Sequence, residues 1–183
     1  MVRLAIADNP VFELSDIEAR RAGKSYSVDT IGSFRNDYPG DELFFIIGSD
    51  SFLEIGLWRR YAEIFPLCNL VVVERPGRPI SSLSAALPIA IRGEFSYNIK
   101  LNPDKQDKCV SEVIFCQKIA ENNLLLTNRL EHRSGQHVYF LRGCLLDISS
   151  TEIRQLAATG RSITYLIPPD VEAYIKEQRI YTE

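Results

Sequence analysis

Residues Ile148 to Arg154, with the sequence Ile-Ser-Ser-Thr-Glu-Ile-Arg, combine residue types that suit phosphate binding. The first backbone N–H groups of a helix lack partners inside the helix and carry partial positive charge. The hydroxyls of Ser149, Ser150 and Thr151 add donors, and Arg154 offers its guanidinium fork to phosphate oxygens. An ordinary helix start is the alternative, with Thr151 as the N-cap and Arg154 on the solvent-facing side. The segment therefore predicts either a polyphosphate site or a plain cap.

A second candidate site follows the apolar run of residues 43–47, where the chain reads Gly48-Ser-Asp50. In open α/β sheets, ligands bind beyond the carboxyl ends of the strands, and a carboxylate there can accept hydrogen bonds from ribose hydroxyls. Glycine at such a place allows a close approach of the backbone. Gly48 and Asp50 are thus candidate nucleotide ligands, and the alternative for Asp50 is a cap on the next helix.

Trp58 and Ser27 are two further candidates. Trp58 is the single tryptophan of the chain, and its flat indole can stack on an aromatic heterocycle, with packing in the core as the alternative. Ser27 closes the triplet Ser25-Tyr26-Ser27 at the expected start of a helix, where hydroxyls and N–H groups favour an anion. A simple helix cap is the alternative for this triplet.

The elements that must position these residues alternate between strand and helix, which predicts an α/β fold with a parallel sheet. Residues 43–47 and 70–73 read as strands buried on both faces, and helical spacing over 50–65 joins them as a right-handed crossover. A further strand is expected over 137–141, in which His137 and His132 flank a polar turn and not a metal site. Helices are expected at 15–23, 27–37, 151–159 with Gly160 as the stop, and 170–178. We expect one domain over 1–183 with a helical C-terminal region, and an insertion or flap at about 78–131.

Composition excludes several classes of protein. The net charge is −3, so an extended basic surface for nucleic acid is not expected. No run reaches the roughly 18 apolar residues of a membrane span, and the start of the chain lacks the layout of a signal peptide. These features predict a cytoplasmic protein without a membrane partner. The four cysteines show no C-x-x-C spacing and are expected to be free thiols.

Six segments, taken in order, resemble bacterial nicotinate mononucleotide adenylyltransferase. They are Ser-Tyr-Ser-Val-Asp-Thr at 25–30, Ile-Ile-Gly-Ser-Asp at 46–50, Trp58, Arg-Pro-Gly at 75–77, Ile-Ser-Ser-Thr-Glu-Ile-Arg at 148–154 and Ser-Ile-Thr-Tyr-Leu-Ile-Pro at 162–168. The resemblance extends from near residue 1 to the C-terminus, interrupted by the middle segment. It implies a Rossmann-like nucleotidyltransferase that transfers the adenylyl group of ATP to nicotinate mononucleotide with magnesium, releasing pyrophosphate and forming nicotinate adenine dinucleotide.

The resemblance also implies roles for the candidate residues. Gly48 and Asp50 would hold the adenosine ribose, and Trp58 would stack on the pyridine ring. Ser27, where the family has threonine, would help to bind the nicotinate carboxylate. The ATP phosphates would lie on Ser149, Ser150, Thr151 and Arg154, with Arg154 neutralising their charge. The expected partners are small nucleotides, and homo-oligomer formation is left open.

One departure from the family concerns the glycine-rich turn G-x-F-x-P-x-H-x-G-H, which does not occur in the 183 residues. By comparison with the family, residues 1–6 look like the end of a helix, and the first strand and the histidine turn are expected upstream of Met1. The histidines of that turn contact the phosphates, so the 183 residues alone are expected to be inactive or nearly so. The alternative is a catalytically inactive nucleotide-binding protein of the same fold.

Overall fold

The computed structural model describes residues 1–80, 86–96, 125–142 and 148–181 of the chain. The chain divides into two compact units. Residues Arg21–Leu146 form the sheet unit, whereas Met1–Arg20 and Asp147–Glu183 together form the terminal unit. Each unit has an apolar core of its own. The single domain expected over 1–183 stays a prediction.

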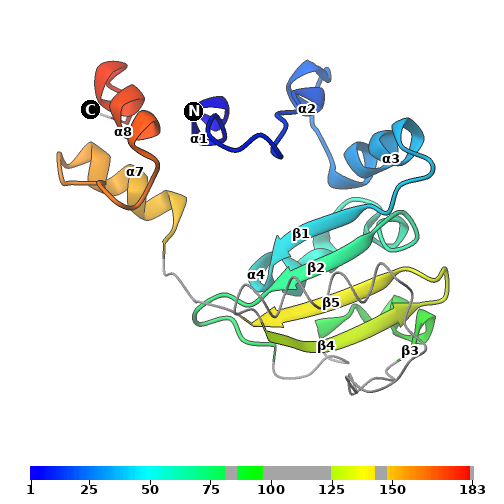
Figure 1. Cartoon of the computed structure of the whole chain (residues 1–183). Coiled ribbons are helices and arrows are strands. Elements are labelled where there is room, and N and C mark those ends of the chain that lie inside the picture. The colour runs from blue at the N-terminus through cyan, green and yellow to red at the C-terminus, as the bar shows by residue number, and fades with distance from the viewer. Residues whose placement is uncertain (81–85, 97–124, 143–147, 182–183) are drawn as a thin grey trace. The chain divides into compact units, whose positions relative to one another are not determined.

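The sheet unit is built, in its described residues, on five strands in the order β1-β2-β5-β4-β3 (Figure 1). Their bounds are β1 Phe44–Gly48, β2 Asn69–Val73, β3 Phe95–Ser96, β4 Leu125–His132 and β5 His137–Arg142. β1 pairs with β2 and β2 with β5 in parallel, whereas β4 is antiparallel to β5 and to β3. The α/β fold is confirmed, and the hairpin of β4 and β5 adds antiparallel strands to the expected parallel sheet.

β1 and β2 differ in how their faces are covered. β2 is buried on both faces, with Leu70 and Val72 in the main core and Val71 in a smaller cluster on the other face. In β1, only one face is covered, since Ile47 is buried while Ile46 is 68% exposed. Side chains alternate along a strand, and β1 is an edge strand of the described sheet. The prediction of two buried faces is therefore wrong for β1.

The crossover between β1 and β2 is not the single helix that the sequence predicts. It consists of α4 (Ser49–Leu53) and two short 3₁₀ helices, η1 (Ile55–Leu57) and η2 (Tyr61–Glu63). Trp58 is extended, with φ −77° and ψ 146°, and Arg60 is left-handed, with φ 52°, so a continuous helix cannot pass through them. The helical spacing of apolar residues still places four of them in the main core: Phe52, Ile55, Ile64 and Phe65.

The helix α3 covers the same core and has the predicted bounds, Ser27–Asp37. Val28 and Ile31 lie one turn apart on one side of this helix, and both are buried. The chain leaves the helix just before Pro39, which cannot continue it. This local pattern places the start of α3 at the edge of the core.

The stretch 78–131 contains part of the sheet in its described residues. Within it lie the 3₁₀ helix η3 (Ile89–Glu94), strand β3 and most of β4. β4 pairs along its length with β5, with a shift in register between Leu126 and Asn128. The insertion stays a prediction for the remainder, because 81–85 and 97–124 lie outside the described residues.

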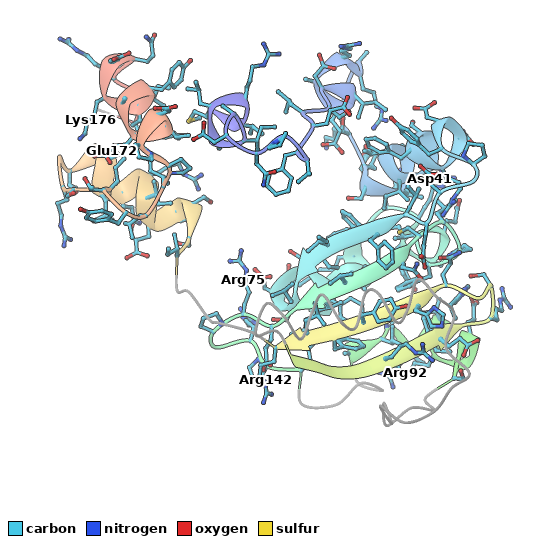
Figure 2. The ribbon with its side chains drawn as sticks, viewed as in Figure 1. Asp41, Arg75, Arg92, Arg142, Glu172 and Lys176 are labelled. Atoms are coloured by element: carbon cyan, nitrogen blue, oxygen red, sulfur yellow. The ribbon has the colours of Figure 1, made fainter. Side chains whose placement is uncertain are left out.

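The terminal unit is helical, as expected for the C-terminal region. Its helices are α1 Val2–Ala5, α2 Ile17–Arg20, α7 Ser150–Ala158 and α8 Pro169–Glu177 (Figure 1). The core of this unit is formed by Ile163, Val171 and Ile175, against which Leu4 and Ile153 pack. In α8, the ammonium of Lys176 donates to Glu172 at 2.6 Å (Figure 2). This hydrogen bond and that of Thr164 lower the pKa of Glu172.

Candidate functional site

Gly48, Ser49 and Asp50 lie at the carboxyl end of β1, where the sequence predicts a ligand. Gly48 is the last residue of the strand, and Ser49 begins α4. A Cβ atom on Gly48 would lie 2.3 Å from Asp50 Oδ1 and 3.0 Å from Arg75 Nε. A side chain at position 48 would displace the Asp50 carboxylate from its present place. Glycine here allows the Asp50 and Arg75 side chains to lie close to the backbone of the strand end.

The carboxylate of Asp50 has one oxygen that no hydrogen bond satisfies. Among the described residues, Asp50 Oδ1 is buried without a hydrogen-bond partner, and Arg75 Nε lies 3.7 Å from it. The side chain as a whole is 44% exposed, so a ligand can reach the part of it other than the buried Oδ1. Buried acceptors in folded proteins are nearly always hydrogen-bonded, so this carboxylate has unused acceptor capacity. The exposed part of the carboxylate can accept a hydrogen bond from a hydroxyl group of a ligand.

Trp58 lies in the extended segment that follows η1 and is partly buried. Its ring packs edge-on against Phe45 of β1, with 6.3 Å between the ring centroids. Both rings pack against the main core. The core-packing alternative is thus correct for part of the indole, and the remainder of the ring is accessible to solvent.

Ser27 lies at the first position of α3, preceded by Tyr26 in an extended conformation. Tyr26 is the N-cap residue, and its side chain makes no capping hydrogen bond. The guanidinium of Arg59 lies over the Tyr26 ring, 4.7 Å from its centroid. This contact joins the start of α3 to the segment that carries Trp58, and so brings two predicted residues into one neighbourhood.

A second contact fixes the same two segments to each other. Arg60 Nη1 donates to Asp29 Oδ1 at 3.2 Å, and its other nitrogens donate to Glu63 at 2.8 Å and 2.6 Å. Arg60 has a left-handed backbone, and its guanidinium makes these three hydrogen bonds from that conformation. The pKa of Glu63 is lowered by its hydrogen bond with Arg60.

Helix α7 carries the predicted phosphate-binding residues in the terminal unit. The hydroxyl of Ser149 accepts a hydrogen bond from the backbone N–H of Glu152 at 3.1 Å and so caps the helix. The alternative in which Thr151 is the cap is wrong, because Thr151 lies inside the first turn. Its hydroxyl instead accepts a hydrogen bond from Arg154 Nη2 at 3.3 Å. Ser150, Thr151 and Arg154 are exposed and face solvent at this helix start.

The end of α7 agrees with the sequence prediction. Gly160 is left-handed, with φ +68°, and its N–H donates to Ala157 O at 3.1 Å. The N–H of Arg161 donates to Leu156 O at 2.9 Å, which completes a Schellman motif. Glycine is needed here because a side chain at this φ would be strained. Leu145 and Leu146, which precede the helix, lie outside the described residues.

The predicted site residues therefore fall into two sets. Gly48, Asp50, Ser27 and Trp58 belong to the sheet unit, while Ser149, Ser150, Thr151 and Arg154 belong to the terminal unit. Within the sheet unit, Asp50 stands at the strand end, and Ser27 and Trp58 belong to segments joined by the Arg59–Tyr26 contact. Sequence reasoning assigned no role to Arg75, although its Arg-Pro-Gly segment was one of the six that carried the resemblance.

His132 and His137 lie in the β4–β5 hairpin and not among the predicted ligands. His132 is 4% exposed, and its ring nitrogens lie 2.7 Å from Ser134 Oγ and 3.0 Å from Glu94 Oε2. Its ring packs against both Phe65 and Phe95. The expected polar turn is confirmed. Within the described residues, no group of three or more histidine, cysteine or acidic side chains could hold a metal ion.

Cys68 is the free cysteine among the described residues, and it is buried. Burial raises the pKa of its thiol to about 12. A thiol with this pKa is almost wholly protonated at neutral pH and is a poor nucleophile.

The helices in the described part of the chain are all too short or too polar to cross a membrane.

Comparison with known proteins shows the class of protein to which the chain belongs. Residues 1–156 match the family model described as cytidylyltransferase-like. A probable nicotinate-nucleotide adenylyltransferase of Pelobacter propionicus is 58% identical over all 183 residues, and one of Geotalea uraniireducens is 55% identical. The chain spans 73% of the length of each. The chain belongs to the nicotinate-nucleotide adenylyltransferase family, within the cytidylyltransferase-like nucleotidyltransferases.

A solved structure gives the same fold. The chain aligns with a Plasmodium falciparum nicotinic acid mononucleotide adenylyltransferase complexed with APC, at a TM-score of 0.55 and 16% identity. The alignment covers 92% of this chain and 64% of the other. At this identity the match supports the Rossmann-type fold alone.

Proposed function

We propose that the protein transfers the adenylyl group of ATP to nicotinate mononucleotide, forming nicotinate adenine dinucleotide and pyrophosphate in NAD biosynthesis. The observation that carries the proposal is the Asp50 carboxylate at the carboxyl end of β1, whose Oδ1 has no donor among the described residues and whose side chain is 44% exposed. A ribose hydroxyl of ATP can donate to the exposed part of this carboxylate. The 58% identity over the whole chain to a probable nicotinate-nucleotide adenylyltransferase supports the same reaction.

In this reaction, a phosphate oxygen of nicotinate mononucleotide attacks the α-phosphorus of ATP, and pyrophosphate leaves. Little proton transfer is needed, so catalysis depends on placing the two nucleotides and neutralising the developing charge. Gly48 and Asp50 hold the adenosine ribose, and Trp58 stacks on the pyridine ring, with the Ser27 hydroxyl near its carboxylate. At the start of α7, the hydroxyls of Ser149, Ser150 and Thr151, the helix N–H groups and Arg154 bind the phosphates.

Magnesium belongs to this proposal as a companion of ATP. The described residues contain no cluster of three or more side chains that could hold a metal ion. Mg²⁺ is commonly bound through phosphate oxygens and water with few protein ligands. No step assigned to the residues above depends on the metal.

A cytoplasmic location and the use of small nucleotides as partners are part of the same proposal, and homo-oligomer formation remains an open prediction.

A second function is that of a protein that binds the nucleotides without transferring the adenylyl group. This alternative keeps every binding role above and removes only the turnover.

The test measures binding and turnover on the same purified chain. Isothermal titration is run with ATP and with nicotinate mononucleotide, and formation of nicotinate adenine dinucleotide is followed by chromatography. We expect saturable binding of both nucleotides, with ATP binding weakened in Asp50→Ala. Turnover that is lost in Asp50→Ala supports the transferase. Binding without turnover favours the alternative where the DNA upstream of Met1 encodes no histidine turn, because the 183 residues without that turn are expected to be inactive under either function. Absence of saturable binding of either nucleotide would contradict both functions.

A further inference from the structure

Ser49 lies between the two predicted ligands Gly48 and Asp50, and its side chain points away from solvent. The residue is 0% exposed, one of few buried polar residues in the described part of the chain. Its hydroxyl makes two hydrogen bonds to the segment that follows β2. It accepts from the backbone N–H of Arg75 at 2.9 Å and donates to the backbone carbonyl of Arg78 at 2.7 Å. Ser49 therefore satisfies both ends of one short turn.

That turn consists of the residues Arg75-Pro76-Gly77-Arg78. The N–H of Arg78 donates to Arg75 O at 3.1 Å, and Gly77 has φ +71°. Proline at the second position and a glycine of positive φ at the third are typical of a type II turn. The turn is therefore well formed in itself. The hydrogen bond within the turn does not determine where the turn lies relative to β1. The two hydrogen bonds of the Ser49 hydroxyl connect the turn to the end of β1.

The turn begins with the residue that faces Asp50. Arg75 Nε lies 3.7 Å from Asp50 Oδ1, and a Cβ on Gly48 would approach the Arg75 side chain to 3.0 Å. The guanidinium is about half exposed, and Figure 2 shows Arg75 at the same end of the sheet as Arg142. Arg142 is held by Glu74, with 2.6 Å between Arg142 Nε and Glu74 Oε2. Arg75 is thus the cation that the turn presents beside the orphaned oxygen of Asp50.

We propose that Ser49 is a positioning residue of the nucleotide site: its buried hydroxyl ties the Arg75–Arg78 turn to the carboxyl end of β1 and so holds the Arg75 guanidinium beside Asp50. The proposal rests on the proposed function, because it assigns Arg75 to the same ATP site. Arg75 carries a positive charge that suits the phosphates or the ribose oxygens of the nucleotide. Ser49 acts through Arg75 and does not itself touch the ligand.

The first measurement tests the tie without any ligand. In Ser49→Ala, the Arg75 N–H loses its acceptor, so hydrogen–deuterium exchange at residues 74–79 is expected to accelerate by about tenfold. Ser33→Ala is the matched control, since the Ser33 hydroxyl donates to Asp29 O at 2.9 Å within α3, away from the turn. Its exchange at 74–79 should equal that of the parent. Ser49→Cys, which keeps the shape but hydrogen-bonds weakly, serves if Ser49→Ala does not fold.

The second measurement tests the action through Arg75. We expect the dissociation constant for ATP to rise about tenfold in Ser49→Ala and in Arg75→Ala, and to rise no further when both are combined. If Ser49→Ala weakens ATP binding in the Arg75→Ala protein as strongly as it does in the parent, the positioning role is contradicted. Unchanged hydrogen–deuterium exchange at residues 74–79 in Ser49→Ala would show that the Ser49 hydroxyl does not hold the turn. If the parent chain binds no ATP, the proposed function and this role at its site both fail, and the exchange result still decides whether Ser49 holds the turn.

Discussion

The side chain of Asn69, at the start of β2, accepts a hydrogen bond from the backbone N–H of His137, at the start of β5, with 2.8 Å between Oδ1 and N. Asn69 is 1% exposed, and its Nδ2 donates to Glu42 Oε1 at 2.9 Å. One side chain thus connects the segment before β1 with β2 and β5. These two hydrogen bonds form in the observed register of the neighbouring strands and so add to its stability.

Asn69→Ala is expected to lower the free energy of unfolding by about 1–3 kcal/mol, because it leaves the His137 N–H without its acceptor. Denaturant unfolding followed by circular dichroism measures the change. Asn36→Ala, at an exposed position of α3, is the matched control and should shift stability by about 0.5 kcal/mol or less. An equal effect of the two substitutions would show that the Asn69 hydrogen bonds contribute nothing.

The pH dependence of stability should report His137. Burial, followed by the charge of Arg129, lowers the pKa of His137. The folded state therefore binds this proton less readily than the unfolded state, whose histidine has a pKa of about 6.5. Stability is fully present above that pH and declines as the pH falls through the lowered pKa of the folded state. Melting temperatures between pH 7.5 and 5 should fall with acidification, and His137→Gln should flatten that decline. An unaltered decline in His137→Gln would assign the effect to another group.

Capping and phosphate binding at α7 can be separated because the Ser149 hydroxyl is the cap while that of Ser150 is not. Ser149→Ala should lower the stability of the terminal unit by about 1 kcal/mol, whereas Ser150→Ala should leave it nearly unchanged. Ser149→Asp keeps a capping oxygen but adds a negative charge. It should retain the stability of the parent and weaken ATP binding, which thermal unfolding and titration calorimetry measure. Undiminished ATP affinity in Ser149→Asp would count against a phosphate site at this helix start.

The stacking role of Trp58 is accessible to fluorescence because it is the single tryptophan of the chain. Nicotinate mononucleotide should quench its emission in a saturable manner. Trp58→Phe keeps an aromatic ring against Phe45 and should weaken the affinity by about 0.5–1.5 kcal/mol, roughly two- to tenfold. ATP affinity should stay as in the parent and serves as the internal control. Absence of quenching in the folded protein would remove Trp58 from the site.

The start of α3 at Ser27, its end before Pro39 and the stop of α7 at Gly160 were all predicted correctly from the sequence. Each of these features depends on residues within a few positions of one another: a periodic apolar face, a proline, or a glycine at a left-handed position. The six segments that resemble the adenylyltransferase family are likewise short and local. The sequence was therefore sufficient for the class of fold and for these helix ends, whereas the roles of the candidate ligands stay predictions.

Tertiary structure decided the features that join distant residues. Ser49 and Arg75 are 26 positions apart, and Asn69 and His137 are 68 apart. The local sequence around these four residues does not specify their partners. Strand register and the path of the chain between strands determine which residues meet. The same reason explains the two errors at β1 and at the crossover. An apolar run is compatible with one or two covered faces, and a helical spacing of apolar residues is compatible with a chain that breaks at Trp58 and Arg60 yet buries the same side chains.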